Sequence, residues 1–188
     1  QSGLSAHVDE LAGTIYALYR TRYKIQPDKD STSREVYLLS SVDHGQSFQS
    51  SRVDNSKLQR DPRSSGVLFQ DPDTTLLTWD TRGRVSWCKI RRNLNKVDSL
   101  LDIKDEEHAF WRSHPVGATS AIEVIVAWLE QPAKEGKLAD KDAPASIGWQ
   151  VSYRDGRAPV GRGQAPESAG KSRPAVFARK AGGFTLLY

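Results

Sequence analysis

The sequence predicts an all-β fold built from repeated antiparallel units, and two observations support this prediction. No segment shows the apolar period of about 3.6 residues that marks an amphipathic helix, whereas short apolar runs recur between clusters of Gly, Pro, Asp and Ser. Strongly apolar segments also end on an aromatic residue at Tyr19, Trp79, Trp128 and Tyr188, at intervals of 60, 49 and 60 residues. Intervals of this size are typical of repeat architectures in which each unit is one small sheet.

Each repeat begins with two strands joined by a turn. The four strand pairs cover residues 6–11 with 14–19, 65–69 with 75–79, 114–118 with 123–128, and 173–177 with 184–188. A third strand is expected at 34–39, 83–88 and 146–151, and an outer fourth strand at 48–53, 97–103 and 159–163. The sequence therefore predicts about three and a half four-stranded blades of a β-propeller, at approximately 5–54, 64–103, 113–163 and 172–188.

Composition excludes several classes of function. The 27 basic and 23 acidic residues are scattered, so the net charge of +4 does not indicate a nucleic-acid-binding surface. No apolar run approaches the roughly 20 residues that a membrane-spanning helix needs.

The single cysteine, Cys88, excludes a disulfide within the chain and is expected to be a buried thiol. The absence of methionine is expected of a processed chain or a piece of a longer protein.

A turn motif follows the apolar run 35–40. Its members are Ser41, Asp43, Gly45, Ser47 and Phe48. The Asp43 carboxylate is expected to accept backbone N–H groups, Gly45 to take a positive φ, and Phe48 to fill the edge of the blade. The alternative is an Asp/Gly hairpin that arose by chance.

This motif resembles the Asp-box, or BNR repeat, of sialidase-like β-propellers, and the repeat pattern extends the resemblance over most of the chain. The chain is also similar in its overall pattern to uncharacterised secreted bacterial proteins described as exo-sialidase-like. The resemblance implies an extracellular or periplasmic location and a function connected with carbohydrate.

Three and a half blades do not close a ring. Further sequence, a second chain or an open arrangement would each account for the shortfall. An open ring leaves strand edges unpaired, which proteins normally avoid. Self-association that completes the propeller is therefore one expectation.

The meander order determines which strand ends share a face. In each blade the first strand lies nearest the axis, and the turn between the third and fourth strands, where Asp43 lies, is at the opposite end from the start of the first strand. Residues that open a first strand or follow a second strand are therefore expected to surround the central opening of the propeller, which we call the funnel, on the face opposite Asp43. They are His7, Arg20, Asp80, His114, Glu130 and Arg173. The alternative for each is a solvated strand end or a hydrogen bond between blades.

The preferred function is a sialidase-like module, non-catalytic or uncharacterised, that binds a glycan or protein partner on this face. The alternative is an exo-sialidase-like glycoside hydrolase whose catalytic set is completed by sequence or a chain outside this one. Sialidases use a Tyr nucleophile, and their arginines grip the substrate carboxylate. Arg20, Arg112 and Arg173 would supply such arginines, but the early Phe/Tyr-Arg-Ile-Pro motif of that family is absent, so no catalytic residue is assigned.

A purely structural repeat domain is the third alternative. No cofactor and no metal are expected, because the histidines match no zinc-binding spacing.

Overall fold

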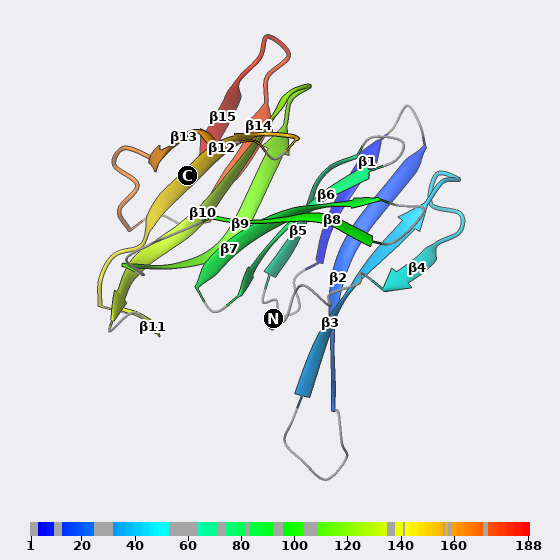
Figure 1. The fold of residues 1–188 in the computed structure, drawn as a ribbon, viewed down its shortest axis with the longest axis horizontal. Helices are drawn as coiled ribbons and strands as arrows, with labels where there is room; N and C mark the ends of the chain where they lie inside the picture. Colours follow the sequence, from blue (N-terminus) through cyan, green and yellow to red (C-terminus); the bar gives the residue numbers. More distant parts are fainter. Residues whose placement is uncertain are drawn as a thin grey trace.

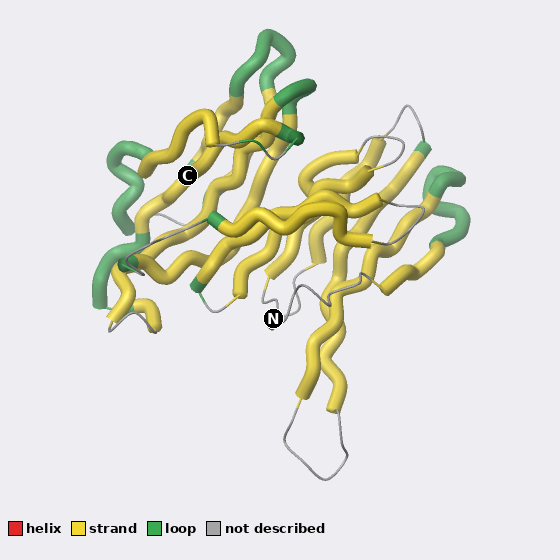
Figure 2. Tube along the Cα trace, viewed as in Figure 1, coloured by secondary structure: helices red, strands yellow, loops and turns green. Residues whose placement is uncertain are grey.

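The computed structural model (Figure 1) describes most of the chain. The described residues are 4–9, 13–24, 32–52, 64–70, 74–81, 83–91, 96–103, 109–134, 138–140, 142–155, 157, 159–170 and 173–188. Within these ranges the regular structure consists of β-strands, and no helix occurs (Figure 2). In this part of the chain there is accordingly no helix with the length and apolarity that crossing a membrane requires.

The first two sheets are four-stranded antiparallel meanders, in which each strand pairs with its neighbours in the chain. The first sheet contains β1 (Leu4–Asp9), β2 (Thr14–Lys24), β3 (Thr32–Ser41) and β4 (Gln49–Arg52). The second contains β5 (Ser64–Gln70), β6 (Thr74–Thr81), β7 (Arg84–Arg91) and β8 (Lys96–Asp102). This strand order is that of a propeller blade.

The third sheet has the same order with one short addition. Its main strands are β9 (Phe110–Thr119), β10 (Glu123–Lys134), β12 (Ser146–Tyr153) and β13 (Pro159–Gln164). The additional strand β11 (Leu138–Ala139) pairs with the end of β10. The last sheet has two strands in the described residues, β14 (Ala175–Ala178) and β15 (Phe184–Leu187), which correspond to the first half of a blade.

The sheets are arranged around their first strands. β1 lies beside β5, β5 beside β9, and β9 beside β14. In Figure 1 the sheets follow one another from the blue strands at the right to the red strands at the upper left. The structure thus confirms the prediction of an all-β, partial propeller with about three and a half blades.

Strand β10 is apolar on both faces because it lies between two packed interfaces. One face contributes to a buried cluster with the second sheet, formed by Val85, Trp87, Ile103, Val124, Val126 and Trp128. The other face contributes Ala127 and Leu129 to a cluster that extends to Val176 and Leu186 of the last sheet. A strand buried on both faces requires such a continuous apolar run.

His7, His114 and Arg173 do not open their innermost strands as predicted. β1 begins at Leu4, so His7 lies inside the strand, opposite Tyr16. β9 begins at Phe110, which pairs with Pro132, so His114 lies inside the strand and does not open it. Aromatic residues favour strands, and Phe110 extends the pairing beyond the predicted start. β14 begins at Ala175, so Arg173 precedes its strand.

Candidate functional site

The 41–48 turn joins β3 and β4, and the Asp43 carboxylate organises it. Asp43 Oδ1 accepts hydrogen bonds from the Ser41 hydroxyl (2.7 Å) and the Ser47 backbone N–H (2.9 Å), and Oδ2 accepts one from the Ser47 hydroxyl (2.6 Å). The Gly45 N–H donates to the Ser41 hydroxyl oxygen (2.9 Å), and Gly45 has a φ of +83°. The hydrogen bonds from Ser47, followed by that from Ser41, lower the pKa of Asp43 from 3.8 to about 2. These residues stabilise a turn.

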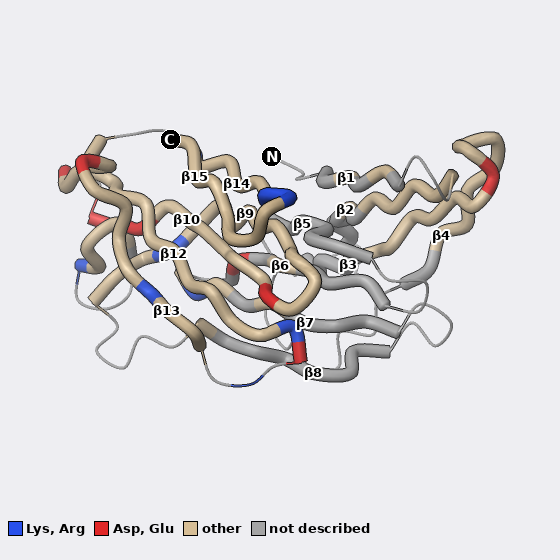
Figure 3. Tube along the Cα trace, turned by 90° about the horizontal axis from the view of Figure 1, so that it is seen from above, with Lys and Arg blue, Asp and Glu red and all other residues tan. Residues whose placement is uncertain are grey.

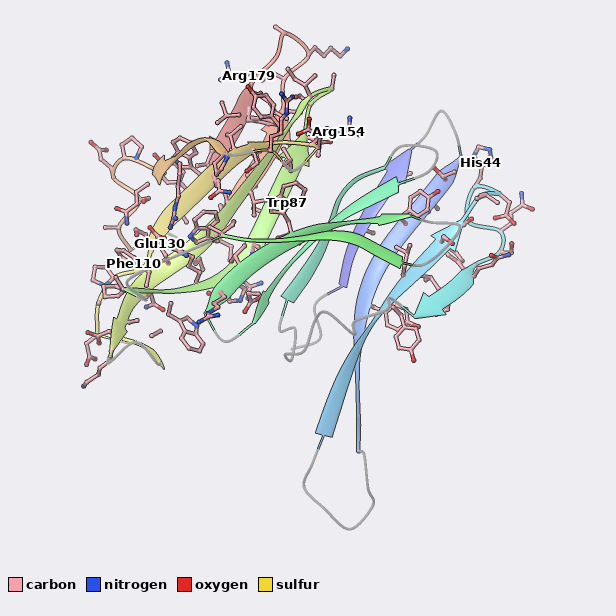
Figure 4. The ribbon with its side chains drawn as sticks, in the orientation of Figure 1. His44, Trp87, Phe110, Glu130, Arg154 and Arg179 are labelled. Carbon is pink, nitrogen blue, oxygen red and sulfur yellow. The ribbon has the colours of Figure 1, made fainter. Side chains whose placement is uncertain are left out.

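The turn also identifies one end of the molecule. The His44 N–H donates to the carbonyl of Gly13, which lies just before β2 (2.9 Å), and the Arg154 N–H donates in the same way to the carbonyl of Ile122, just before β10 (3.0 Å). The turns before the second and fourth strands therefore share one end, where Figure 4 shows His44 and Arg154. Phe48 is 47% exposed and does not fill the edge of the blade, because it lies in the turn before β4 begins.

Asp43 should make this turn sensitive to acid. Its pKa in the folded protein, about 2, lies below the ordinary 3.8, so the carboxylate contributes stability above pH 3.8 that is lost as the pH falls toward 2. Asp43→Asn is expected to lower the melting temperature at neutral pH and to converge with the wild type toward pH 2, as followed by circular dichroism. Asp142→Asn, on another turn, should keep the wild-type pH dependence. A constant difference between Asp43→Asn and wild type across this range would contradict the prediction.

Inside β9, between Phe110 and Thr119, the strand contains a bulge at His114. The β9–β10 register shifts between Ala127 and Leu129, so that His114 and Pro115 together lie opposite Trp128. His114 has a φ of +53°, which is uncommon for a residue other than glycine and is further disfavoured before proline. Strain of this kind costs about 1–3 kcal/mol and is concentrated at binding and catalytic sites. A bulge also changes the direction in which a side chain leaves its strand.

Asp80 and Arg173 lie within electrostatic range of His114. Burial is the main cause that lowers the pKa of His114 below its ordinary value of 6.5, Arg173 lowers it further, and Asp80 acts in the opposite direction. Asp80, near the end of β6, is only 2% exposed, whereas Arg173 is exposed on the segment before β14. We call Asp80, His114 and Arg173 the axial cluster. Of the predicted ring, Asp80 and Arg173 therefore each lie within electrostatic range of His114.

Glu130 lies elsewhere, in the interface between the second and third sheets, and is 4% exposed. Its Oε2 accepts hydrogen bonds from Trp128 Nε1 (2.9 Å) and Arg112 Nε (3.4 Å), and its Oε1 accepts one from Gln164 Nε2 (2.7 Å). Arg112 is 1% exposed and also donates Nη1 to the Ile103 carbonyl (3.1 Å). The three partners of Glu130 all belong to the third sheet, and Arg112 makes the connection to the second sheet through Ile103. Both Glu130 and Arg112 lie inside the protein.

His7 and Arg20 are the remaining residues of the predicted ring. The side chains of His7 and Arg20 lie outside the described part of the structure, and their backbones lie in β1 and β2. In the part of the chain that is described, no three His, Cys, Asp or Glu side chains gather in a way that would hold a metal ion.

Sequence reasoning missed the bulge and the contact between His114 Nδ1 and the Ser113 hydroxyl (3.1 Å). One signal was present, the dipeptide His114-Pro115 within a predicted strand. Proline cannot donate to a strand ladder, so inside a sheet it marks an edge or a bulge.

The axial cluster combines three complementary groups. Arg173 is exposed and supplies guanidinium donors, and His114 is half-buried and supplies an imidazole whose lowered pKa favours the neutral form at pH 7. Asp80, which is 2% exposed, contributes its negative charge from inside the protein. Together these groups can both accept and donate hydrogen bonds, as a ligand with several hydroxyl groups requires.

No protein-family model matches the sequence, and a search of curated proteins finds no match. The structure is similar to the crystal structure of a xylan β-1,4-xylosidase from Bacillus halodurans C-125, with a TM-score of 0.56 and 14% sequence identity over 98% of this chain. The chain spans 37% of the length of that enzyme. At this identity the similarity concerns the fold alone.

Proposed function

We propose that this chain is a glycan-binding propeller module and that the axial cluster is its binding site. The observation that carries the proposal is the strained bulge at His114, which lies within electrostatic range of Asp80 on another sheet and of Arg173 before β14. Strain is retained where the surrounding structure compensates for it, commonly at functional sites.

The chemistry of the cluster suits a carbohydrate. The planar guanidinium of the exposed Arg173 donates to a pair of oxygens, and the neutral imidazole of the half-buried His114 can accept a hydrogen bond from a sugar hydroxyl or donate one to it. The similarity in fold to a xylosidase supports a carbohydrate ligand. The sialidase resemblance supports a secreted module, either extracellular or periplasmic.

Binding of labelled glycans to the purified chain tests this function. An array that includes xylo-oligosaccharides and sialosides identifies ligands, and calorimetry measures their affinity. Arg173→Ala is expected to weaken binding about 10- to 100-fold, because a hydrogen bond to a charged group contributes about 1.5–3 kcal/mol. Arg157→Ala, an exposed arginine at the other end of the molecule, should bind normally. Absence of any glycan signal, or equal loss in both variants, would overturn the proposal.

Ligand binding should depend on pH through His114. Because burial and Arg173 lower the pKa of His114 below 6.5, the folded protein disfavours the protonated imidazole. The stability that this group contributes is therefore present above pH 6.5 and is lost as the pH falls through the lowered value. Affinity is expected to change over the same acidic range in wild type and not in His114→Gln. Parallel pH profiles for the two proteins would contradict this prediction.

Glycoside hydrolysis is the second candidate, favoured by the fold of the xylosidase and by the burial of Asp80 beside His114. Most glycosidases use two carboxyl groups, so a partner for Asp80 would come from further sequence or a second chain. Fluorogenic xylosides and sialosides test turnover. Turnover that both Asp80→Asn and Arg173→Ala abolish would show that the chain is a glycosidase and would overturn the proposal that it only binds glycans.

Self-association would complete the ring. In the described residues β15 pairs with β14 alone, so its other edge can accept a strand. Sedimentation velocity is expected to give a dimer. A monomer at the highest concentration measured would exclude this arrangement.

A further inference from the structure

A groove lies between two hairpin turns at the end of the molecule opposite the axial cluster. One wall is the β9–β10 turn at residues 119–123, and the other is the β14–β15 turn, with Arg154 beside them. The volume of the groove is about 680 Å³, within the range of roughly 300–1,000 Å³ typical of ligand sites. We call it the hairpin groove. Figure 4 shows Arg154 and Arg179 near each other at this end.

Three of the four charged residues in the lining are basic. Arg154, Arg179 and Lys180 contribute three cations, and Glu123 contributes one carboxylate. Figure 3 shows a blue segment of basic residues beside β14. A concave surface lined mainly by one sign of charge attracts ligands of the opposite sign.

Backbone carbonyls fix both guanidinium groups. Arg154 Nη1 donates to the carbonyls of Ala121 (3.0 Å) and Ser120 (3.5 Å) on one wall. Arg179 Nε and Nη2 donate to the Phe184 carbonyl on the other wall (3.2 and 2.9 Å). Because these bonds hold the two side chains in place, a ligand would lose less entropy in ordering them.

The wall formed by Gly182 and Gly183 has no side chains and faces open space. Gly182 and Gly183 have φ values of +90° and +75°, and a Cβ built on either meets no atom within 4 Å. Thr119 and Ser120 add hydroxyl groups, and Ile122 adds an exposed apolar surface (66% exposed). The open space at Gly182 and Gly183 leaves room for a sugar ring against this wall.

We propose that the hairpin groove binds an acidic oligosaccharide, whose carboxylates would contact Arg154, Arg179 and Lys180. The ligand class is a chain of uronic acid residues or a similar carboxylated sugar. Arginine forms paired hydrogen bonds with a carboxylate, and lysine adds a point charge. This site does not depend on the axial cluster, so either can fail without the other.

Calorimetry of the purified chain with oligogalacturonate tests the proposal. Lys180→Glu is expected to weaken binding at least about tenfold, since reversal of the charge replaces an attraction with a repulsion. Glu123→Gln, which removes the opposing carboxylate, is expected to tighten binding about two- to threefold. Affinity should fall as salt is raised, because the Debye length shortens from about 10 Å at 0.1 M to about 3 Å at 1 M.

Two controls separate this site from others. Arg157→Glu makes the same change in net charge as Lys180→Glu, outside the groove and on an exposed arginine paired with Asp155, and should bind oligogalacturonate normally. Arg173→Ala in the axial cluster should also bind it normally. Equal weakening by Lys180→Glu and Arg157→Glu would show a response to net charge and overturn the site.

The class of ligand is tested in the same way. Neutral xylo-oligosaccharides should not compete with oligogalacturonate for the groove. Poly-glutamate that binds as tightly as oligogalacturonate, with the same loss in Lys180→Glu, would overturn the assignment to a sugar in favour of an acidic peptide. Absence of oligogalacturonate binding by a folded wild-type chain would overturn the proposal altogether.

Discussion

Glu130→Ala is expected to lower the free energy of unfolding by about 3–5 kcal/mol, since removal of one member of a buried ion pair leaves the other charge uncompensated. The charge left is Arg112, which is 1% exposed. The same change removes the acceptor of the Trp128 and Gln164 hydrogen bonds. The environment cannot easily relax, because a Cβ at Gly148 would already clash with the Trp128 indole nitrogen and the Glu130 carboxylate.

Urea unfolding followed by circular dichroism measures this loss. Glu123→Ala, at the partly exposed start of the same strand, should stay within about 0.5 kcal/mol of wild type. Replacement of both partners, Arg112→Met with Glu130→Leu, should recover most of the stability, because well-packed apolar residues often substitute for a buried pair at little cost. A Glu130→Ala protein as stable as Glu123→Ala would refute the structural role of the pair.

Trp128→Ala is expected to cost about 3–5 kcal/mol, the range for removal of a large buried aromatic side chain. Trp128 is fully buried in the cluster shared by the second and third sheets. Its ring also lies 5.5 Å from the Arg112 guanidinium and 5.9 Å from that of Arg162, both at cation–π distance. The substitution therefore removes apolar contact, a hydrogen-bond donor and a partner for two cations.

Trp128→Phe separates these contributions. Phe keeps most of the apolar contact but cannot donate to Glu130, so its cost should be about 1–3 kcal/mol. Both variants are measured by the same urea titration. A Phe variant as unstable as the Ala variant would assign the whole effect to the hydrogen bond and contradict the packing argument.

The architecture could be predicted from the sequence because its signals are local and repeated. Tyr19, Trp79 and Trp128 each lie in a second strand of a sheet, and the alternation of apolar residues with turn residues marks most strands. The predicted ends were wrong for β2 and β10, which continue to Lys24 and Lys134, so that Arg20 and Glu130 lie inside these strands. The network of the 41–48 turn could also be anticipated, since its donors and acceptors lie within a few residues of one another.

The role of individual ring residues could not be predicted in the same way. The sequence predicts the same place for Glu130 and Asp80, after a second strand, yet Glu130 lies inside β10 and pairs with Arg112, whereas Asp80 acts on His114. Arg112 and His114 both lie on β9, well separated along the chain from the residues they affect, and no local pattern specifies these partners. The conformation of His114 likewise depends on the register between β9 and β10. Pro115 indicates an irregularity in the strand but does not specify this register.

The hydrogen bonds of Arg112 between the second and third sheets affect how these sheets unfold locally. Its backbone N–H donates to the Gly83 carbonyl (2.9 Å), just before β7, and its side chain donates to the Ile103 carbonyl (3.1 Å), just after β8. One residue of β9 is therefore bonded to both chain ends of the β7–β8 pair. Gly83, with a φ of +79°, admits the Trp111 ring so closely that an added Cβ would lie 2.6 Å from it. Local opening of the second sheet would have to break these bonds as well as its own ladder. The second and third sheets should therefore exchange their amide hydrogens as one cooperative unit, slower than the solvent-exposed turns at either end.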